Sequence, residues 1–250
     1  MNDAPGTPDR RDVVRWDVVA QNLPEHARNP IHTDEGARTA GFPRALVAGV
    51  TTYAYLTHPI VVAWGLDWLA AGGGEVRLRR PVFDHDLVRC TPVEVGHDGS
   101  VTVHALTDEP DQPRAVLRAV RRGGAAPPAR AGEPLRAIEV RLDGELGADY
   151  GSRAGDALDL FAVHGLVHPA VWPAIANQVV HTQVARGSWI HTRSIVRHHA
   201  LARAGTTATV RAVVVRRFQA HGERAVLDVV IESDGRAVAS LEHEAIVALP

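Results

Sequence analysis

The amino-acid sequence predicts an α+β fold in which one set of elements occurs twice. Each half of the 250-residue chain contains a strand, then a long apolar helix, then several strands in a row. A segment rich in Gly, Pro and Ala, residues 124–136, separates the halves and predicts a linker between units 1–123 and 137–250. A helix that is apolar all round is normally buried, so we expect an antiparallel sheet to wrap each one.

In the first unit, weak alternation of apolar and polar residues predicts an initial strand, and Asp34 is a typical N-cap for a short helix. The long helix should bend near Pro59, because proline lacks the N–H that continues a helix. We expect strands over 13–19, 75–82, 87–95, 101–107 and 115–122, helices over 34–41 and 45–69, and a glycine connector at 72–74.

The second unit repeats this order. Its last strands are separated by His221-Gly222 and by Asp234-Gly235, which are typical of two-residue hairpin turns. We expect strands over 137–142, 189–196, 206–217, 225–232 and 237–249, and a buried helix over 167–184.

Composition excludes several classes of function. The net charge of -2 argues against a general nucleic-acid binder. All 27 basic residues are Arg, which excludes lysine Schiff-base chemistry and a P-loop. Cys90 is the only cysteine, so no internal disulfide forms, as suits a cytoplasmic protein. Residues 45–66 carry no formal charge, but Thr, His and Pro dilute their hydropathy, and we expect a buried helix and no membrane contact.

The most informative motif is Asn-Pro-Ile-His-Thr-Asp at 29–34, which precedes the long apolar helix. Together with the residues after it, this motif resembles the MaoC-like hydratase and dehydratase family. The resemblance rests on Asn29, Pro30, His32, Asp34, Ala37, Gly41 and Phe42. It covers the whole chain and implies a double hotdog fold, two curved antiparallel sheets each wrapped around a central helix. The chain would then be a pseudo-dimer, and association of two such chains into a homodimer is an alternative that the sequence does not decide.

The resemblance implies a lyase that hydrates an enoyl thioester or dehydrates a 3-hydroxyacyl thioester of coenzyme A or acyl carrier protein. His32 would be the base, because imidazole titrates near neutral pH. Asn29 would orient this imidazole or bind the attacking water. Gly49, at the start of the long helix, would offer its N–H to the substrate oxyanion. No cofactor and no metal is implied.

The sequence departs from the family at important positions. Ala27 stands where the family has its catalytic Asp, and Ala48 replaces a family His. Glu25, two residues before Ala27, is our candidate for the missing carboxylate, although a solvated loop residue would look the same. In the second half Asp156 matches the family Asp, but no His follows in the family position. We do not expect His32 and Asp156 to meet.

Four further residues are candidates for binding the substrate. Arg80 and Arg193, on predicted strands, would bind the phosphates of the carrier. The alternative is that they are only solvent-exposed residues on one face of the sheet. Tyr53 and Trp172 lie on the apolar helices and would line an acyl tunnel or fill the core. Additional candidates for the cleft between the units are His181, His191, His198 and His199.

Without the family Asp, other functions remain open. The site would also suit cyclisation of a polyketide-like acyl chain, which a cleft can fold into a reactive conformation. Hydrolysis of a thioester and a catalytically decayed binding partner are further alternatives. We do not expect a serine hydrolase, because the sequence has no Gly-x-Ser-x-Gly elbow.

Overall fold

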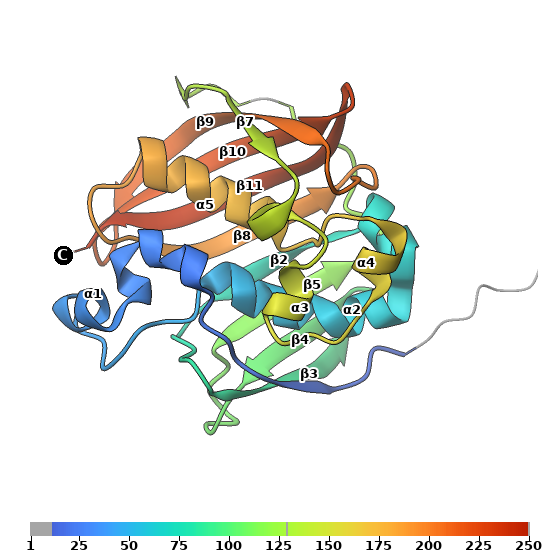
Figure 1. Ribbon diagram of the computed structural model, residues 1–250, viewed down its shortest axis with the longest axis horizontal. Coiled ribbons are helices and arrows are strands. Elements are labelled where there is room, and N and C mark those ends of the chain that lie inside the picture. The colour runs from blue at the N-terminus through green and yellow to red at the C-terminus, as the bar shows by residue number, and fades with distance from the viewer. Residues whose placement is uncertain (1–11, 129, 250) are drawn as a thin grey trace, which may run out of the picture.

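Eleven strands form one antiparallel sheet in the computed structural model, which describes residues 12–128 and 130–249 (Figure 1). The strands are β1 (Trp16–Val19), β2 (Gly73–Leu78), β3 (Leu87–Val95), β4 (Val101–Leu106), β5 (Ala115–Val120), β6 (Glu133–Pro134), β7 (Ile138–Arg141), β8 (Ile190–His198), β9 (Thr207–Gln219), β10 (Glu223–Ser233) and β11 (Arg236–Ala248). Their order is β1-β3-β4-β5-β2-β8-β11-β10-β9-β6, and β7 also pairs with β9. Each half of the chain therefore builds half of the sheet, and β2 and β8 meet in the middle.

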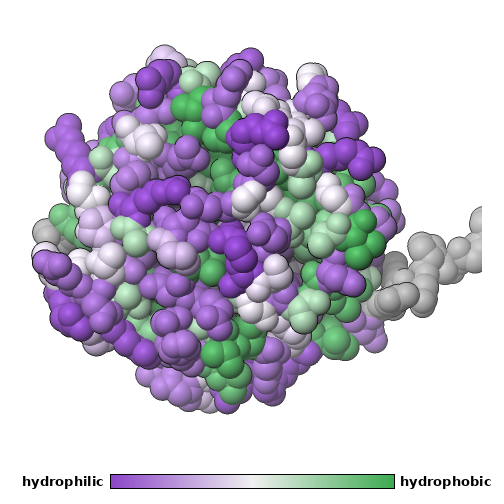
Figure 2. Space-filling view, in the orientation of Figure 1, coloured by the Kyte–Doolittle hydropathy of each residue, from purple (hydrophilic) through white to green (hydrophobic). Residues whose placement is uncertain are grey.

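Two long helices, α2 (Gly49–Ala71) and α5 (Val171–Gln183), lie on the same face of this sheet (Figure 1). The outer surface on this side is mostly hydrophilic, with small separate apolar patches (Figure 2). Shorter elements are η1 (Pro24–Arg28), η2 (Pro30–His32), α1 (Asp34–Thr39), η3 (Gly144–Leu146), α3 (Tyr150–Arg153) and α4 (Leu160–His164). None of the helices in the described segments combines the length and the apolar character that crossing a membrane requires. Most of α2 is buried, as its sequence predicts.

The two halves repeat each other in their hydrogen bonds. Val47 N–H donates to Val82 O at 2.8 Å, and Val167 N–H donates to Ala202 O at 3.0 Å. Each half also has an isolated β-bridge, which joins Leu46 to Phe83 in the first half and Leu166 to Arg203 in the second. The same number of residues separates every one of these equivalents, so the repeat inferred from element order is present in the backbone.

Glycines bring the two half-sheets close together. A Cβ on Gly73 would lie 2.3 Å from Val196 O, and a Cβ on Gly74 would lie 2.7 Å from Arg118 O. Both glycines belong to β2, so the prediction that 72–74 form only a connector is wrong. The close approach of neighbouring backbones is the reason for glycine at these positions.

The first turn of α2 was predicted too early. The chain over 45–48 is extended, because Leu46 and Val47 pair with the segment before β3, and the helix begins only at Gly49. The short helix α1 is capped by Thr33, whose Oγ1 accepts the Gly36 N–H at 3.2 Å, and not by Asp34 as expected. Asp34 instead accepts the N–H of Ala45 at 2.9 Å.

Other local expectations can be compared directly with the backbone. The turns His221-Gly222 and Asp234-Gly235 connect β9 to β10 and β10 to β11, and all four residues have positive φ. Both connections are antiparallel hairpins, as predicted. Two residues lie between the paired Ser233 and Arg236, but three lie between the paired Gln219 and Glu223, so only the second turn is a two-residue hairpin. Within the span 124–136, β6 pairs with β9, so the end of the expected linker joins the sheet.

Helix α2 is broken at Gly65 and not at Pro59. Gly65 has φ 57° and ψ -147°, the one non-helical residue inside α2, whereas Pro59 keeps helical geometry. This combination of angles is essentially restricted to glycine, because a Cβ would clash with the backbone. The break was therefore assigned to the wrong residue.

Gly65→Ala should lower the free energy of unfolding by about 1–3 kcal/mol, because alanine at this φ and ψ is strained. Chemical denaturation of both proteins measures this change. In a regular helix the same substitution would raise stability by up to about 1 kcal/mol. A more stable Gly65→Ala variant would therefore contradict the observed break.

Candidate active site

His32 is held in a defined orientation at the end of η2. Asn29 caps this short turn and Pro30 starts it, so the chain turns sharply and directs the imidazole inward. His32 Nδ1 lies 2.8 Å from the carbonyl oxygen of Leu46, to which a neutral ring donates its N–H. Burial lowers the pKa of His32, and the bond to Leu46 only partly opposes this effect. The ring is therefore neutral at pH 7, with its Nε2 lone pair available.

Two cavities meet at His32. One has a volume of about 180 Å³ and is lined mainly by polar side chains from η1, η3 and α5; we call it the polar cavity. The other has a volume of about 240 Å³ and is lined by more aliphatic residues, near the starts of α2 and β8; we call it the apolar cavity. Both share the residues Asn29, His32, Asn177 and Trp189. His32 thus lies at their junction, between groups from both units.

The amino end of α2 opens on the apolar cavity. Gly49 is its first residue and lines this cavity, and Ala48 before it offers no side-chain cap. Within the described residues, the Gly49 N–H has no acceptor. A Cβ at Gly49 would lie 2.2 Å from Leu78 Cδ1 and 3.3 Å from His191 Nδ1, so a larger residue would crowd the site. The helix end therefore offers an N–H and a partial positive charge to a ligand oxygen.

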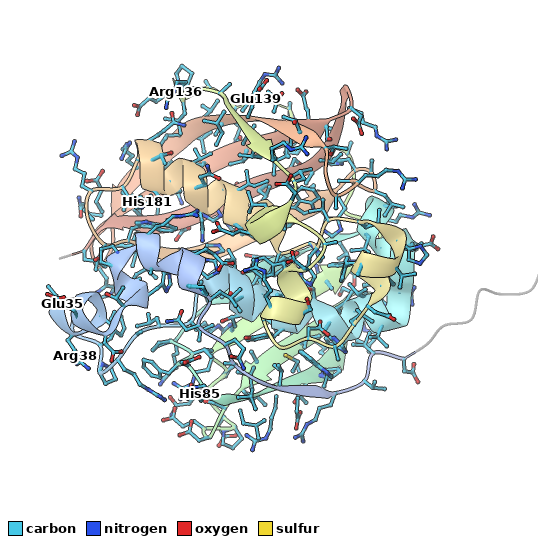
Figure 3. All side chains as sticks on the ribbon, viewed as in Figure 1. Glu35, Arg38, His85, Arg136, Glu139 and His181 are labelled. Atoms are coloured by element: carbon cyan, nitrogen blue, oxygen red, sulfur yellow. The ribbon has the colours of Figure 1, made fainter. Side chains whose placement is uncertain are left out.

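The second unit completes the polar cavity. Asn177 and His181 project from α5, where Figure 3 labels His181, and Trp189 lies just before β8. The Trp189 indole N–H donates to His181 Nδ1 at 3.4 Å. Of the four histidines expected at the cleft, His181 and His191 do line the cavities. His198 and His199 do not: their rings bond to Trp68 O and Ser240 Oγ.

His26 is a cavity residue that the sequence did not reveal. Its ring centroid lies 5.8 Å from that of His32, and both rings line the polar cavity. His26 Nε2 is 3.2 Å from Tyr150 Oη and 3.3 Å from Thr51 Oγ1. Burial, assisted by His32, Arg153 and Arg28, lowers the pKa of His26 to about 3, so it too is neutral at pH 7.

The residues expected to supply a carboxylate do not do so directly. Glu25 lines the polar cavity, but its Oε1 accepts a 2.5 Å hydrogen bond from Arg153, and its side chain is only 7% exposed. Its charge is therefore already neutralised by an ion pair. Ala27, in the family position of the Asp, is exposed and lines neither cavity.

Asn29 does not orient the His32 imidazole, the first of the two roles we expected; the second, binding the attacking water, stays a prediction. Its Nδ2 donates to Trp189 O at 2.8 Å, and among the described residues its side chain makes no hydrogen bond to the His32 imidazole, although its backbone carbonyl accepts the His32 N–H at 3.0 Å. The amide is 4% exposed and ties η2 of the first unit to the chain before β8 of the second. Asn29 thus stabilises the chain at the junction of the cavities, and the Leu46 carbonyl orients the imidazole.

Of the four substrate-binding candidates, only Arg80 lies at a cavity, where it lines the apolar one. Tyr53 is fully buried and Trp172 is 4% exposed; both are core residues that line neither cavity. Arg193 lies between Glu75 and Glu242, at 2.5 Å from each, and joins β2, β8 and β11. The expectations for Tyr53, Trp172 and Arg193 are therefore corrected: the first two fill the core, and the third is an ion-pair partner.

Asp156 does not approach the cavities either. Both of its carboxylate oxygens lie 2.8 Å from His58 Nδ1, and its Oδ1 accepts the Leu158 N–H at 2.8 Å. Trp16 stacks on His58 at a centroid distance of 3.8 Å and covers this pair. The structure thus keeps His32 and Asp156 in separate surroundings, as the sequence led us to expect.

Comparison with known proteins identifies the fold. No protein-family model and no curated protein matches the sequence. Among solved structures, a conserved hypothetical protein from Mycobacterium tuberculosis with a double hotdog fold is 13% identical, with a TM-score of 0.62 over 95% of this chain and 97% of that chain. A MaoC-like dehydratase is 13% identical, with a TM-score of 0.61 over 96% and 99%. An acyl-CoA thioesterase II, TesB2, from Mycobacterium marinum is 14% identical, with a TM-score of 0.50 over 82% and 91%.

These similarities establish the architecture. The chain has a double hotdog fold of the α+β class, with two hotdog units side by side in one polypeptide. Its structural neighbours include both dehydratases and thioesterases.

Proposed function

We propose that this double hotdog chain is a lyase that adds water to a 2-enoyl thioester or removes water from a 3-hydroxyacyl thioester. The observation that carries the proposal is the state of His32. It is a neutral imidazole fixed through Nδ1, its ring lines both cavities, and Gly49 at the helix end lines the apolar one. A base near neutral pH beside an oxyanion donor is what this reaction requires.

In the dehydration direction the Gly49 N–H binds the thioester carbonyl oxygen and stabilises the negative charge that develops there. His32 Nε2 removes the proton from the carbon next to the carbonyl. The bond from the third carbon to its hydroxyl then breaks, and the imidazolium returns its proton to that hydroxyl, which leaves as water. One imidazole therefore serves as base and then as acid, and hydration is the reverse.

Arginines near the apolar cavity support a phosphate-bearing carrier, coenzyme A or the phosphopantetheine arm of acyl carrier protein. Arg79, Arg80 and Arg224 all line this cavity. Arg80 is 3.7 Å from Glu109, and Arg224 is 2.7 Å from Glu244, so both guanidinium groups retain further donors. Arg79 forms no ion pair among the described residues. Guanidinium groups suit phosphate because they donate two parallel hydrogen bonds.

Hydrolysis of the thioester is less well supported. A hotdog site that hydrolyses needs a group to activate water or attack the carbonyl, and the two carboxylates that line the polar cavity with His32, Glu25 and Glu145, are bound to Arg153 and Arg28. The sole cysteine, Cys90, is fully buried. Because Cys90 is buried, a thiol reagent reacts only with thiol released from the substrate.

The test is an assay of the wild-type chain with enoyl and 3-hydroxyacyl thioesters of increasing chain length. We expect interconversion of the two acyl forms with the thioester bond intact. Ultraviolet absorbance follows the enoyl group, and a thiol reagent follows hydrolysis. Release of thiol without formation of a hydroxyacyl thioester would identify a thioesterase. Formation of a ring would identify a cyclase, and no conversion would favour a binding partner.

A further inference from the structure

His26 has a built environment that the mechanism above does not use. Its ring enters the polar cavity from η1 and lies across from His32. Nδ1 of His26 makes no hydrogen bond within the described residues, whereas Nε2 is within hydrogen-bond distance of two hydroxyl groups. One nitrogen is thus anchored in the protein, and the other is left for a ligand.

The anchor is formed by both units. Tyr150 comes from α3 of the second unit and Thr51 from α2 of the first, and their hydroxyl oxygens are 2.9 Å apart. Tyr150 is 1% exposed, and the Arg153 guanidinium lies over its ring at 5.6 Å. Buried hydroxyl groups of this kind fix the orientation of a ring, because leaving them unpaired is costly. When a hydroxyl donates to Nε2, the proton of the neutral ring is on Nδ1, which then donates into the cavity.

We infer that His26 binds the hydroxyl group at the third carbon of the substrate, and the attacking water in the reverse reaction, through its Nδ1–H. Tyr150 is the positioning residue that acts through His26. This inference rests on the proposed function and adds a residue to it. No proton leaves His26: the proton taken by His32 returns to the hydroxyl oxygen, and the water formed stays bound to His26 Nδ1–H until it leaves.

Three features of the site favour this role over a purely structural one. His198 and His243 leave an unpaired ring nitrogen in the buried core, whereas His26, with Nδ1 unpaired among the described residues, lines a cavity. The two ring centroids lie 5.8 Å apart and both rings line the polar cavity, so one ligand in that cavity can contact both. Burial, assisted by the charges of His32, Arg153 and Arg28, lowers the pKa of His26 and keeps its ring neutral, so it does not repel the imidazolium of His32.

The first experiment compares turnover in a double-mutant cycle. His26→Ala should lower kcat about 10- to 100-fold, and His26→Asn, which keeps a donor near the position of Nδ1, should recover part of the loss. Tyr150→Phe should cost less, about 3- to 10-fold. The double variant should be no slower than His26→Ala alone, because Tyr150 acts through His26. Wild-type kcat in His26→Ala, or full additivity of the two losses, would overturn the inference.

A second experiment separates this inference from the proposed function. In a His32→Asn background, in which we expect turnover to be about 10²–10⁴-fold slower, the affinities for 3-hydroxybutyryl-coenzyme A and butyryl-coenzyme A are measured by calorimetry. The hydroxyl should improve affinity about 3- to 10-fold, and adding His26→Ala should abolish that difference. Equal affinities before the His26 change would refute the role of His26, whatever the turnover assay shows. A clear difference without any turnover in the wild type would instead refute the lyase.

Discussion

Replacing His32 with Asn is expected to reduce turnover of an enoyl thioester by about 10²–10⁴-fold, the range typical of a general acid–base residue. Asparagine keeps an N–H near the position of Nδ1 and can still donate to the Leu46 carbonyl, but it has no lone pair in place of Nε2. The loss would therefore report the missing base and not a disturbed loop. Steady-state kinetics of the purified variant provide the measurement.

The pH dependence of wild-type activity is a second test of the role of His32. Because burial lowers the pKa of His32, the free base should persist below the ordinary histidine value of 6.5. In the pH–rate profile of the wild type, activity should fall on the acid side only below pH 6.5. This acidic limb should be absent from the profile of the residual activity of His32→Asn. The exposed His164 on α4 offers a matched control, and His164→Ala should behave as wild type. Wild-type kinetics in His32→Asn would remove His32 from the mechanism.

Asp156→Ala should cost about 3 kcal/mol or more of unfolding free energy. The carboxylate is 4% exposed and accepts hydrogen bonds from His58 and the Leu158 N–H, each of which is worth about 1.5–3 kcal/mol when the acceptor is charged. Urea denaturation at neutral pH measures the change. Asp143→Ala is the matched control, because Asp143 is 54% exposed in its pair with Arg141 and should contribute less than about 1 kcal/mol.

This stabilisation should also depend on pH with a definite sign. Burial acts to raise the pKa of Asp156, but the hydrogen bond and charge of His58 outweigh it, and the pKa lies below its ordinary value of 3.8. The contribution is therefore complete above pH 3.8 and is lost as the pH falls through the lowered pKa of the folded state. The difference between wild type and Asp156→Ala should shrink in acid. A constant difference down to strongly acidic pH would show that packing, and not charge, is lost.

The fold could be predicted because its signals are local. Alternating strands, two apolar helices and turn pairs such as Asp234-Gly235 each depend on residues close in sequence, and these elements lie within a few residues of their expected bounds. The helix break was misplaced because proline and glycine both interrupt helices. Only the backbone angles show that Gly65, and not Pro59, takes the non-helical conformation.

The site was less predictable because its parts are distant in sequence. His32 could be found from a continuous motif, but His26 gains its position from Tyr150, 124 residues away. A polar residue in η1 gives no sign of that partner. Tyr53 and Trp172 were expected at a tunnel because an apolar helix does not reveal which side faces the sheet. Arg193 could not be interpreted without Glu75 and Glu242, which reach it from neighbouring strands.

The central claim is that His32 acts on the acyl group while Gly49 binds the thioester carbonyl. A crystal structure with a 3-hydroxyacyl analogue, in which an amide nitrogen replaces the thioester sulfur, tests it most directly. We predict the analogue's carbonyl oxygen on the Gly49 N–H and its hydroxyl within about 3 Å of His32 Nε2, at the junction of the polar and apolar cavities. An analogue bound with its carbonyl away from Gly49, or with no atom near His32 Nε2, would contradict the account.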